Sequence, residues 1–207
     1  MSDEIPFRIA LLVVIVLLTS VTIFFRRRAK APNEKISHKE EGWIPYIALH
    51  SSAMVLWIST LVYLVIPSAI SWASMPIPSV FRWLCFCVAI LASIPMIWTL
   101  ASLGKNLTDT VITKSDAHLV TSGPYRWVRH PYYSTTAIVM LSVTNLTANW
   151  LVGLGCVLVL TCLALRTPKE EQKLVDKFGS DYLNYKSKTG MFFPFIINVR
   201  KREATPS

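Results

Sequence analysis

The stretch that decides the fold lies at residues 5–25, which read IPFRIALLVVIVLLTSVTIFF. About 20 apolar residues in a helix are long enough to cross the hydrocarbon core of a bilayer. Asp3 and Glu4 precede this block, and three arginines follow it at residues 26–28. A secretory signal peptide has the opposite order of charge. We therefore interpret the block as an uncleaved membrane span with its C-terminal end in the cytoplasm.

Three further apolar blocks occupy residues 43–67, 79–103 and 132–165. Pro95 should kink the helix of the 79–103 block rather than end it. The turn-like segment 145–149 (NLTAN) divides the last block into two helices of about 14 to 17 residues, short for full spans; one long helix is the alternative. We predict an all-α integral membrane protein with about five transmembrane helices, the last two a tight helical hairpin, and a cytoplasmic C-terminal helical segment.

The charges predict the topology. The chain has 21 Lys and Arg against 12 Asp and Glu, and only 16% of its 207 residues are charged. With the N-terminus outside, the cytoplasmic segments 26–42, 104–131 and 166–207 hold 19 of the 21 basic residues, and only Arg8 and Arg82 lie on the other side. This asymmetry follows the positive-inside rule. The membrane would be a bacterial or archaeal inner membrane, or the endoplasmic reticulum of a eukaryote.

The basic balance is not typical of a nucleic-acid-binding protein, because no base-reading motif accompanies it. The four cysteines lie in apolar runs, without a zinc-binding spacing, so we expect no metal site. The sequence has no Gly-rich phosphate loop, no dinucleotide fingerprint and no nucleophile elbow. Any cofactor must be bound in another way.

The C-terminal tail predicts two short helices. Thr167 with Glu170 three residues later is a capping-box pattern, and the proline between them suits the first helical position. Gly179 is a helix stop, residues 181–188 form a second helix, and the apolar residues 192–197 fold back onto the membrane surface.

Two polar clusters flank the hairpin. The segment 118–133 (HLVTSGPYRWVRHPYY) precedes it and the segment 166–171 (RTPKEE) follows it. A hairpin returns the chain to the side where it started, so both clusters should meet at the mouth of an apolar bundle. Carboxylates, guanidinium groups, imidazoles and aromatic faces there suit a ligand that is polar at one end and apolar at the other.

Four ordered motifs carry a resemblance: residues 119–125 (LVTSGPY), 129–133 (RHPYY), 166–171 and 178–185 (FGSDYLNY). Together they resemble the isoprenylcysteine carboxyl methyltransferase family, within the wider group of small membrane methyltransferases that includes phospholipid methyltransferases. The similarity covers about residues 103–197.

The resemblance implies S-adenosylmethionine as methyl donor. It assigns Arg166 to the acceptor carboxylate, and a glutamine of the family would fall near Val111, where this chain has none. The donor-binding residues that it implies are His118, Leu119, Val120, Tyr125, His130, Pro131, Tyr132, Tyr133 and Glu170. The chain would then be one membrane domain, 1–207, with three spans in 1–103 and the catalytic portion in 104–207.

The expected activity is carboxyl O-methylation of an isoprenylcysteine, or of a similar lipophilic carboxylate that enters from the bilayer among the membrane lipids. The alternatives are N-methylation of a phospholipid such as phosphatidylethanolamine, S-methylation of a small thiol, and a membrane transporter or scaffold. Arg166 argues against the phospholipid amine, because a guanidinium repels an ammonium and cannot deprotonate it.

Several site residues have structural alternatives: Glu170 as a helix cap, Tyr132 as an interfacial anchor, His130 as the partner of a backbone group and Arg166 as a snorkelling residue. Arg126 and Arg129 are interpreted as topology and lipid-headgroup residues.

Overall fold

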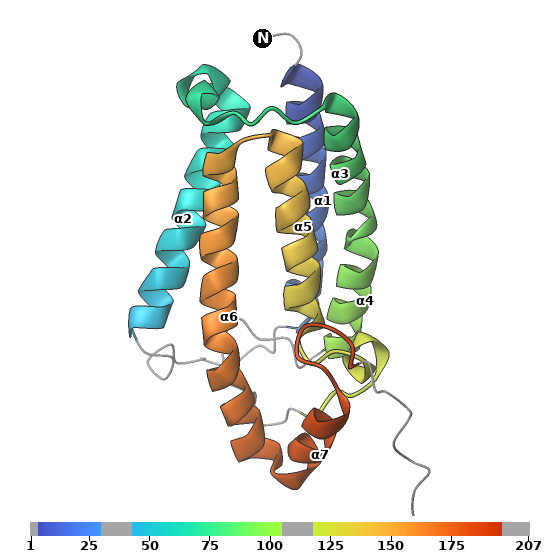
Figure 1. The fold of residues 1–207 in the computed structure, drawn as a ribbon. Coiled ribbons are helices and arrows are strands. Elements are labelled where there is room, and N and C mark those ends of the chain that lie inside the picture. Colours follow the sequence, from blue (N-terminus) through green and yellow to red (C-terminus); the bar gives the residue numbers. More distant parts are fainter. Residues whose placement is uncertain (1–3, 30–42, 105–117, 196–207) are drawn as a thin grey trace, which may run out of the picture.

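The computed structural model describes residues 4–29, 43–104 and 118–195, which form a bundle of long helices (Figure 1). Beyond two isolated bridges, these residues contain no β-structure, so the all-α prediction is confirmed. The elements are α1 (Ile5–Ala29), α2 (Trp43–Val65), the 3₁₀ helix η3 (Pro67–Ala73), α3 (Ser79–Leu91), α4 (Ser93–Leu103), the 3₁₀ helix η5 (Gly123–Arg126), α5 (Pro131–Thr147), α6 (Trp150–Phe178) and α7 (Ser180–Lys188).

Four helical segments in the described part of the chain are long and apolar enough to cross a membrane: Ile5–Ala29, Trp43–Val65, Ser79–Leu103 and Trp150–Phe178. Most of their residues face outward, and the exposed ones include many large apolar side chains. Such a surface needs lipid around it. The chain is an integral membrane protein. Helix α5 has 17 residues, and its role as a fifth span stays a prediction.

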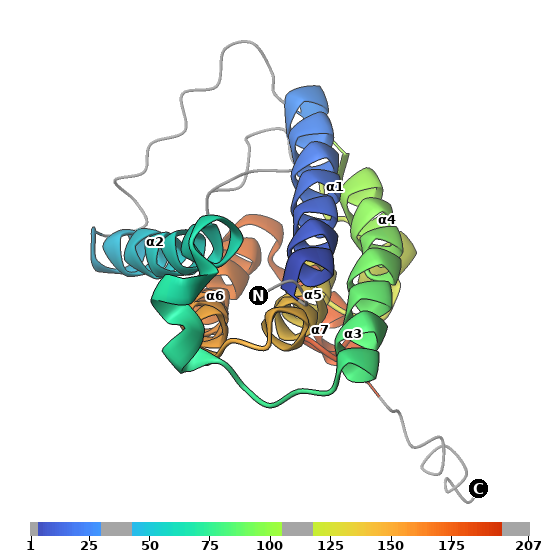
Figure 2. The same cartoon turned by 90° about the horizontal axis from the view of Figure 1, so that it is seen from above.

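The bundle has α5 near its centre. Figure 2 shows α6 on one side of α5 and α1 with α3 on the other, while α2 lies against the outer side of α6. Residues from α1, α2, η3, α3 and α5 build the core; its buried members are Phe7, Ala10, Leu11, Tyr63, Ile70, Cys85 and Leu146.

Helices α3 and α4 are one span with a one-residue interruption at Ala92. Pro95 has no N–H to donate to the carbonyl of Leu91, so the hydrogen-bond ladder is broken just there. The backbone at Ala92 stays in the right-handed helical region (φ −64°, ψ −17°). The prediction that Pro95 does not end the helix is confirmed, and the bend expected there stays a prediction.

The hairpin between α5 and α6 is formed as predicted, but its second helix has 29 residues rather than about 14 to 17 and is long enough to span a membrane. Ala148 adopts the left-handed conformation (φ 47°, ψ 42°) that ends α5. The Asn149 side chain then caps α6 by accepting from the backbone N–H of Leu151 at 3.1 Å, and donates to the carbonyl of Ile70 at 3.0 Å. The bond to Ile70 joins the turn of the hairpin to η3.

A buried ion pair ties several helices together at the end of the bundle where the hairpin turns. The Arg82 guanidinium donates to both carboxylate oxygens of Glu4 at 2.7 Å and to the carbonyl of Leu146 at 2.9 Å. It also lies 3.6 Å from the centre of the Phe7 ring. Sequence reasoning placed Arg82 at this end but did not find its partners.

Helix α6 corrects the prediction for the tail. It runs without interruption to Phe178 and contains Pro168 in its interior, so no separate helix begins at the capping-box pattern. The Thr167 hydroxyl bonds back to the carbonyl of Leu163 at 2.9 Å, as threonine does inside a helix. The pattern misled because a threonine hydroxyl has this alternative to capping. The stop at Gly179 (φ 53°) and the helix after it are confirmed.

Candidate functional site

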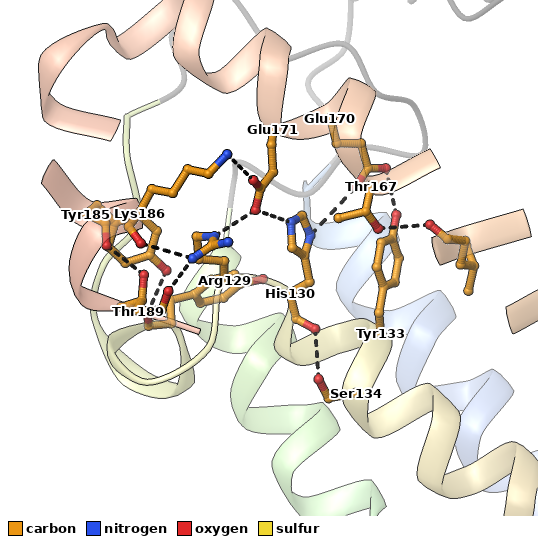
Figure 3. A network of polar contacts seen from close by, with 12 residues as sticks. Arg129, His130, Tyr133, Ser134, Thr167, Glu170, Glu171, Tyr185, Lys186 and Thr189 are labelled. Carbon is orange, nitrogen blue, oxygen red and sulfur yellow. Dashed lines mark hydrogen bonds and ion pairs between the residues drawn. The ribbon is translucent and has the colours of Figure 1, made fainter. Parts of the chain in front are cut away.

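The two polar clusters meet at the end of the bundle where α5 begins, opposite the hairpin turn (Figure 1). Figure 3 shows the side chains of Arg129, His130 and Tyr133 pointing toward Glu170 and Glu171 on α6. Pro131 occupies the first position of α5, where its missing N–H costs nothing. The His-Pro pair therefore fixes where the helix starts and places His130 directly before its first turn.

Glu170 is the centre of one half of the site. Its Oε1 accepts from the Tyr133 hydroxyl at 2.6 Å and lies 3.0 Å from Nε of Arg166, one helical turn earlier. Its Oε2 lies 3.7 Å from Nδ1 of His130. The hairpin thus brings four predicted site residues into contact: His130, Tyr133, Arg166 and Glu170. Since Glu170 lies inside α6, it is not a helix cap.

Glu171 is the centre of the other half. Its carboxylate lies 2.7 Å from Nε of Arg129 and 2.7 Å from Nζ of Lys186 on α7. Nε2 of His130 lies 3.5 Å from the same carboxylate. The side chains of Glu171 and Arg129 are only 4% and 7% exposed. The His130 ring is therefore held between two neighbouring carboxylates.

The segment after α7 covers this half of the site. The backbone N–H groups of Arg129 and His130 donate to the carbonyls of Gly190 and Met191 at 2.8 and 3.0 Å. The Ser134 hydroxyl donates to the carbonyl of Phe192 at 2.6 Å. We call residues 189–192 the tail strap. Residues 190–192 contact the site. The fold-back of residues 192–197 onto the membrane surface stays a prediction, and residues 196 and 197 lie outside the described residues.

Tyr125 is buried in η5 and bonded to α7. Its carbonyl accepts from the Tyr185 hydroxyl at 2.6 Å. Burial raises the pKa of Tyr185 to about 12, so this hydroxyl keeps its proton and donates at neutral pH. Burial also raises the pKa of Tyr125 above its ordinary value. Both tyrosines act here as neutral groups.

The remaining predicted residues are placed less directly. His118 is exposed and Leu119 and Val120 are half-buried, in the extended segment before η5. The Tyr132 ring meets the Tyr133 ring edge-on at 6.2 Å. Their donor-binding roles stay predictions. Val111, where the family's glutamine would fall, lies outside the described residues.

Arg129 requires a correction. It was interpreted as a lipid-headgroup residue, but its side chain is buried and bonded to Glu171 and to the carbonyls of Lys186 and Thr189. Sequence reasoning gave Glu171 and Lys186 no role. The adjacent second carboxylate in the 166–171 motif was the available signal, but nothing in one sequence tells which basic residues will face it.

The arrangement offers hydrogen-bond acceptors, a guanidinium and aromatic faces. The His130 and Tyr133 rings are stacked, with centroids 5.5 Å apart and planes 7° apart. Within the described part of the chain, no group of three or more His, Cys, Asp or Glu is placed to hold a metal ion. The site suits binding and alignment of organic groups at the end of an apolar bundle.

Fold and site together define a helical integral membrane protein with a polar, aromatic-rich site at one end of its bundle. Residues 83–176 match the model of the isoprenylcysteine carboxyl methyltransferase (ICMT) family, and this segment contains His130, Tyr133, Arg166 and Glu170. The resemblance found in the sequence is confirmed over that segment.

Curated relatives show the same likeness. The chain is 38% identical over 100 residues to human protein-S-isoprenylcysteine O-methyltransferase, which covers 47% of this chain and 35% of that protein. It is 30% identical over 96 residues to the Arabidopsis thaliana protein-S-isoprenylcysteine O-methyltransferase B, covering 45% of this chain and 49% of the relative. The match thus spans between about a third and a half of these relatives.

A solved structure of the eukaryotic intramembrane Ras methyltransferase ICMT is also similar. It shows 25% sequence identity and a TM-score of 0.47, over 78% of this chain and 55% of that one.

Proposed function

We propose that this chain is an S-adenosylmethionine-dependent membrane methyltransferase that esterifies the carboxylate of an isoprenylcysteine or a similar lipophilic acid. The observation that carries the proposal is that His130, Tyr133 and Arg166 all contact the carboxylate of Glu170. All four residues lie inside the segment that is similar to the methyltransferase family. The relatives' names supply the reaction, and the contacts supply residues suited to it.

The donor-side residues fit S-adenosylmethionine chemically. Its ammonium and hydroxyl groups need acceptors, and Glu170 has an oxygen, Oε2, whose contact with His130 at 3.7 Å is longer than a hydrogen bond. Nε2 of His130 is buried, and its contact with the Glu171 carboxylate, at 3.5 Å, is longer than an ordinary hydrogen bond. The stacked rings of His130 and Tyr133 present aromatic faces for an adenine or a sulfonium. When bound, the donor supplies an electrophilic methyl group on a sulfonium.

Arg166 is our candidate for holding the acceptor. A guanidinium has five N–H donors in a planar fork that matches a carboxylate. The contact between Nε of Arg166 and Glu170 orients this fork from the adjacent turn of α6. Arg166 would thereby hold the acceptor carboxylate beside the donor-binding groups.

The chemistry makes few demands on the protein. A carboxylate oxygen forms a bond to the methyl carbon, and the carbon–sulfur bond breaks with its electron pair going to sulfur. A carboxylic acid is already ionised at neutral pH, so no general base is required. Alignment of the two partners and exclusion of water supply the acceleration. This suits a site of buried positioning groups.

The orientation of the protein in the membrane follows from the distribution of its basic residues. The site lies at the end of the bundle where α1 finishes with three arginines, and the segments at that end hold most basic residues of the chain. By the positive-inside rule that end faces the cytoplasm. The donor would enter from the cytoplasm and the acceptor sideways from the bilayer.

The test is labelled methyl transfer by the purified full-length chain. S-adenosylmethionine with a labelled methyl group is offered with farnesylcysteine, phosphatidylethanolamine or a small thiol. We expect a base-labile methyl ester on farnesylcysteine. Transfer to the phospholipid or the thiol alone would contradict the acceptor assignment. No donor binding and no transfer to any acceptor would contradict the enzyme assignment.

A further inference from the structure

The ion-pair cluster around Glu171 lies next to the proposed donor-binding groups but belongs to none of the roles assigned above. Arg129, Glu171 and Lys186 come from three different elements: the loop before α5, the end of α6 and α7. A buried ion pair of this kind is weak support for stability by itself, because desolvation offsets much of the attraction. Its position suggests another purpose.

Arg129 connects the cluster to the tail strap. Nη1 of Arg129 donates to the carbonyls of Lys186 and Thr189, and its backbone N–H donates to the carbonyl of Gly190 at 2.8 Å. Figure 3 shows Arg129 between Glu171 on one side and Thr189 and Lys186 on the other. One guanidinium therefore joins α6, α7 and the strap.

The strap in turn contacts His130. The His130 backbone N–H donates to the carbonyl of Met191 at 3.0 Å, and the Phe192 ring lies 6.0 Å from the His130 ring. At Gly190 a Cβ would collide with the carbonyl oxygen of Phe193, so the tail backbone turns tightly on itself just there. Because the strap is hydrogen-bonded to the backbone of His130, a shift in the strap should move the imidazole.

We propose that Arg129, Glu171 and Lys186 form a latch that holds the tail strap over His130 and so sets the position of the imidazole beside Glu170. Arg129 and Lys186 are positioning residues in this proposal, because neither contacts the His130 side chain among the interactions described. The link to donor binding rests on the proposed function, whereas the effect on the ring does not.

The imidazole can be observed directly. The chain has four histidines, so ¹⁵N-histidine labelling of the detergent-solubilised protein gives four sets of ring signals, and His130→Gln identifies that of His130. Glu171→Gln is not informative, since Glu171 faces the ring itself. Arg129→Lys keeps the charge but cannot span Glu171 and the strap carbonyls, and Arg126→Lys is its matched control, since Arg126 is exposed and lies over Trp127.

A second variant and its control change more exposed side chains, in case Arg129→Lys does not fold. The Lys186 side chain is 43% exposed, so Lys186→Met should fold, and Lys188→Met at the end of α7 is its control. We expect Arg129→Lys and Lys186→Met to displace the His130 ring signals while both controls leave them unchanged. Ring signals that stay at their wild-type positions in folded Lys186→Met would overturn the latch.

Donor binding supplies the second measurement. Calorimetric titration with S-adenosylhomocysteine should show affinity about tenfold lower for Arg129→Lys than for Arg126→Lys, because small displacements of a binding group are costly. Displaced ring signals with unchanged affinity would refute the role in donor binding. If the wild-type protein binds no S-adenosylhomocysteine, the proposed function fails, while the ring signals still decide the latch.

Discussion

Glu170 and Glu171 are neighbours in sequence, yet replacing each with glutamine should have different consequences. Removing one member of a buried ion pair costs about 3–5 kcal/mol, because the other charge stays buried without its partner. Arg129 keeps its strap carbonyls and Lys186 is 43% exposed. We therefore expect Glu171→Gln to cost about 3 kcal/mol, at the lower end. In Glu170→Gln the amide oxygen can still accept from the Tyr133 hydroxyl, so the cost should be about 1 kcal/mol.

Thermal unfolding of the two purified variants measures this difference. A chain of this size loses about 2–4 °C of Tm per kcal/mol. Glu171→Gln should therefore lower Tm by about 6–12 °C, and Glu170→Gln by about 2–4 °C. Methyl transfer by folded Glu170→Gln should fall about tenfold to a hundredfold, because it loses charge-assisted hydrogen bonds to the donor of about 1.5–3 kcal/mol. A Tm shift for Glu170→Gln as large as that for Glu171→Gln would refute the division of roles.

Three further predictions concern other parts of the molecule. Arg166→Ala should raise KM for the lipid acceptor about tenfold or more, through loss of a bidentate carboxylate contact, and an unchanged acceptor KM in steady-state kinetics would contradict its role. Arg82→Met, at the opposite end of the bundle, should lower the free energy of unfolding by about 2 kcal/mol. This is less than the cost of breaking a fully buried ion pair, because the Glu4 side chain is 39% exposed. Methyl transfer per folded molecule should stay at the wild-type level in the labelled-transfer assay. The raised pKa of Tyr185, about 12, means that the folded protein holds this proton more tightly than the unfolded chain, so stability should fall between pH 10 and 12. Tyr185→Phe, which loses the bond to Tyr125, should fall less over that range in thermal unfolding, and parallel curves for the two proteins would contradict this.

The meeting of His130, Tyr133, Arg166 and Glu170 could be predicted from the sequence because each pair is close together along the chain. His130 and Tyr133 lie at the start of one helix, and Arg166 and Glu170 are one turn apart on another. A hairpin between the two helices is enough to bring them together. His118, Leu119 and Val120 had no such local support, and the binding roles of all the assigned residues stay predictions.

Predictions from local sequence patterns were wrong where the same residues are compatible with two different local structures. Thr167 and Pro168 are typical of a helix start, but the helix that begins at Trp150 continues through them to Phe178. Arg129 lies next to an apolar block, as basic residues that set membrane topology do. Its burial depends on Glu171 and on the strap, which is about 60 residues away in the sequence.

The sequence alone determined that this chain is a helical membrane protein, where most of its helices begin and end, and that a polar site lies at one end. Those properties follow from the length of apolar blocks, from single residues such as Gly179, and from the placement of charge. Only the tertiary structure decided which carboxylate faces which cation. That pairing depends on distances between α5, α6 and α7, and these distances are set by packing across the bundle rather than by the order of residues along the chain.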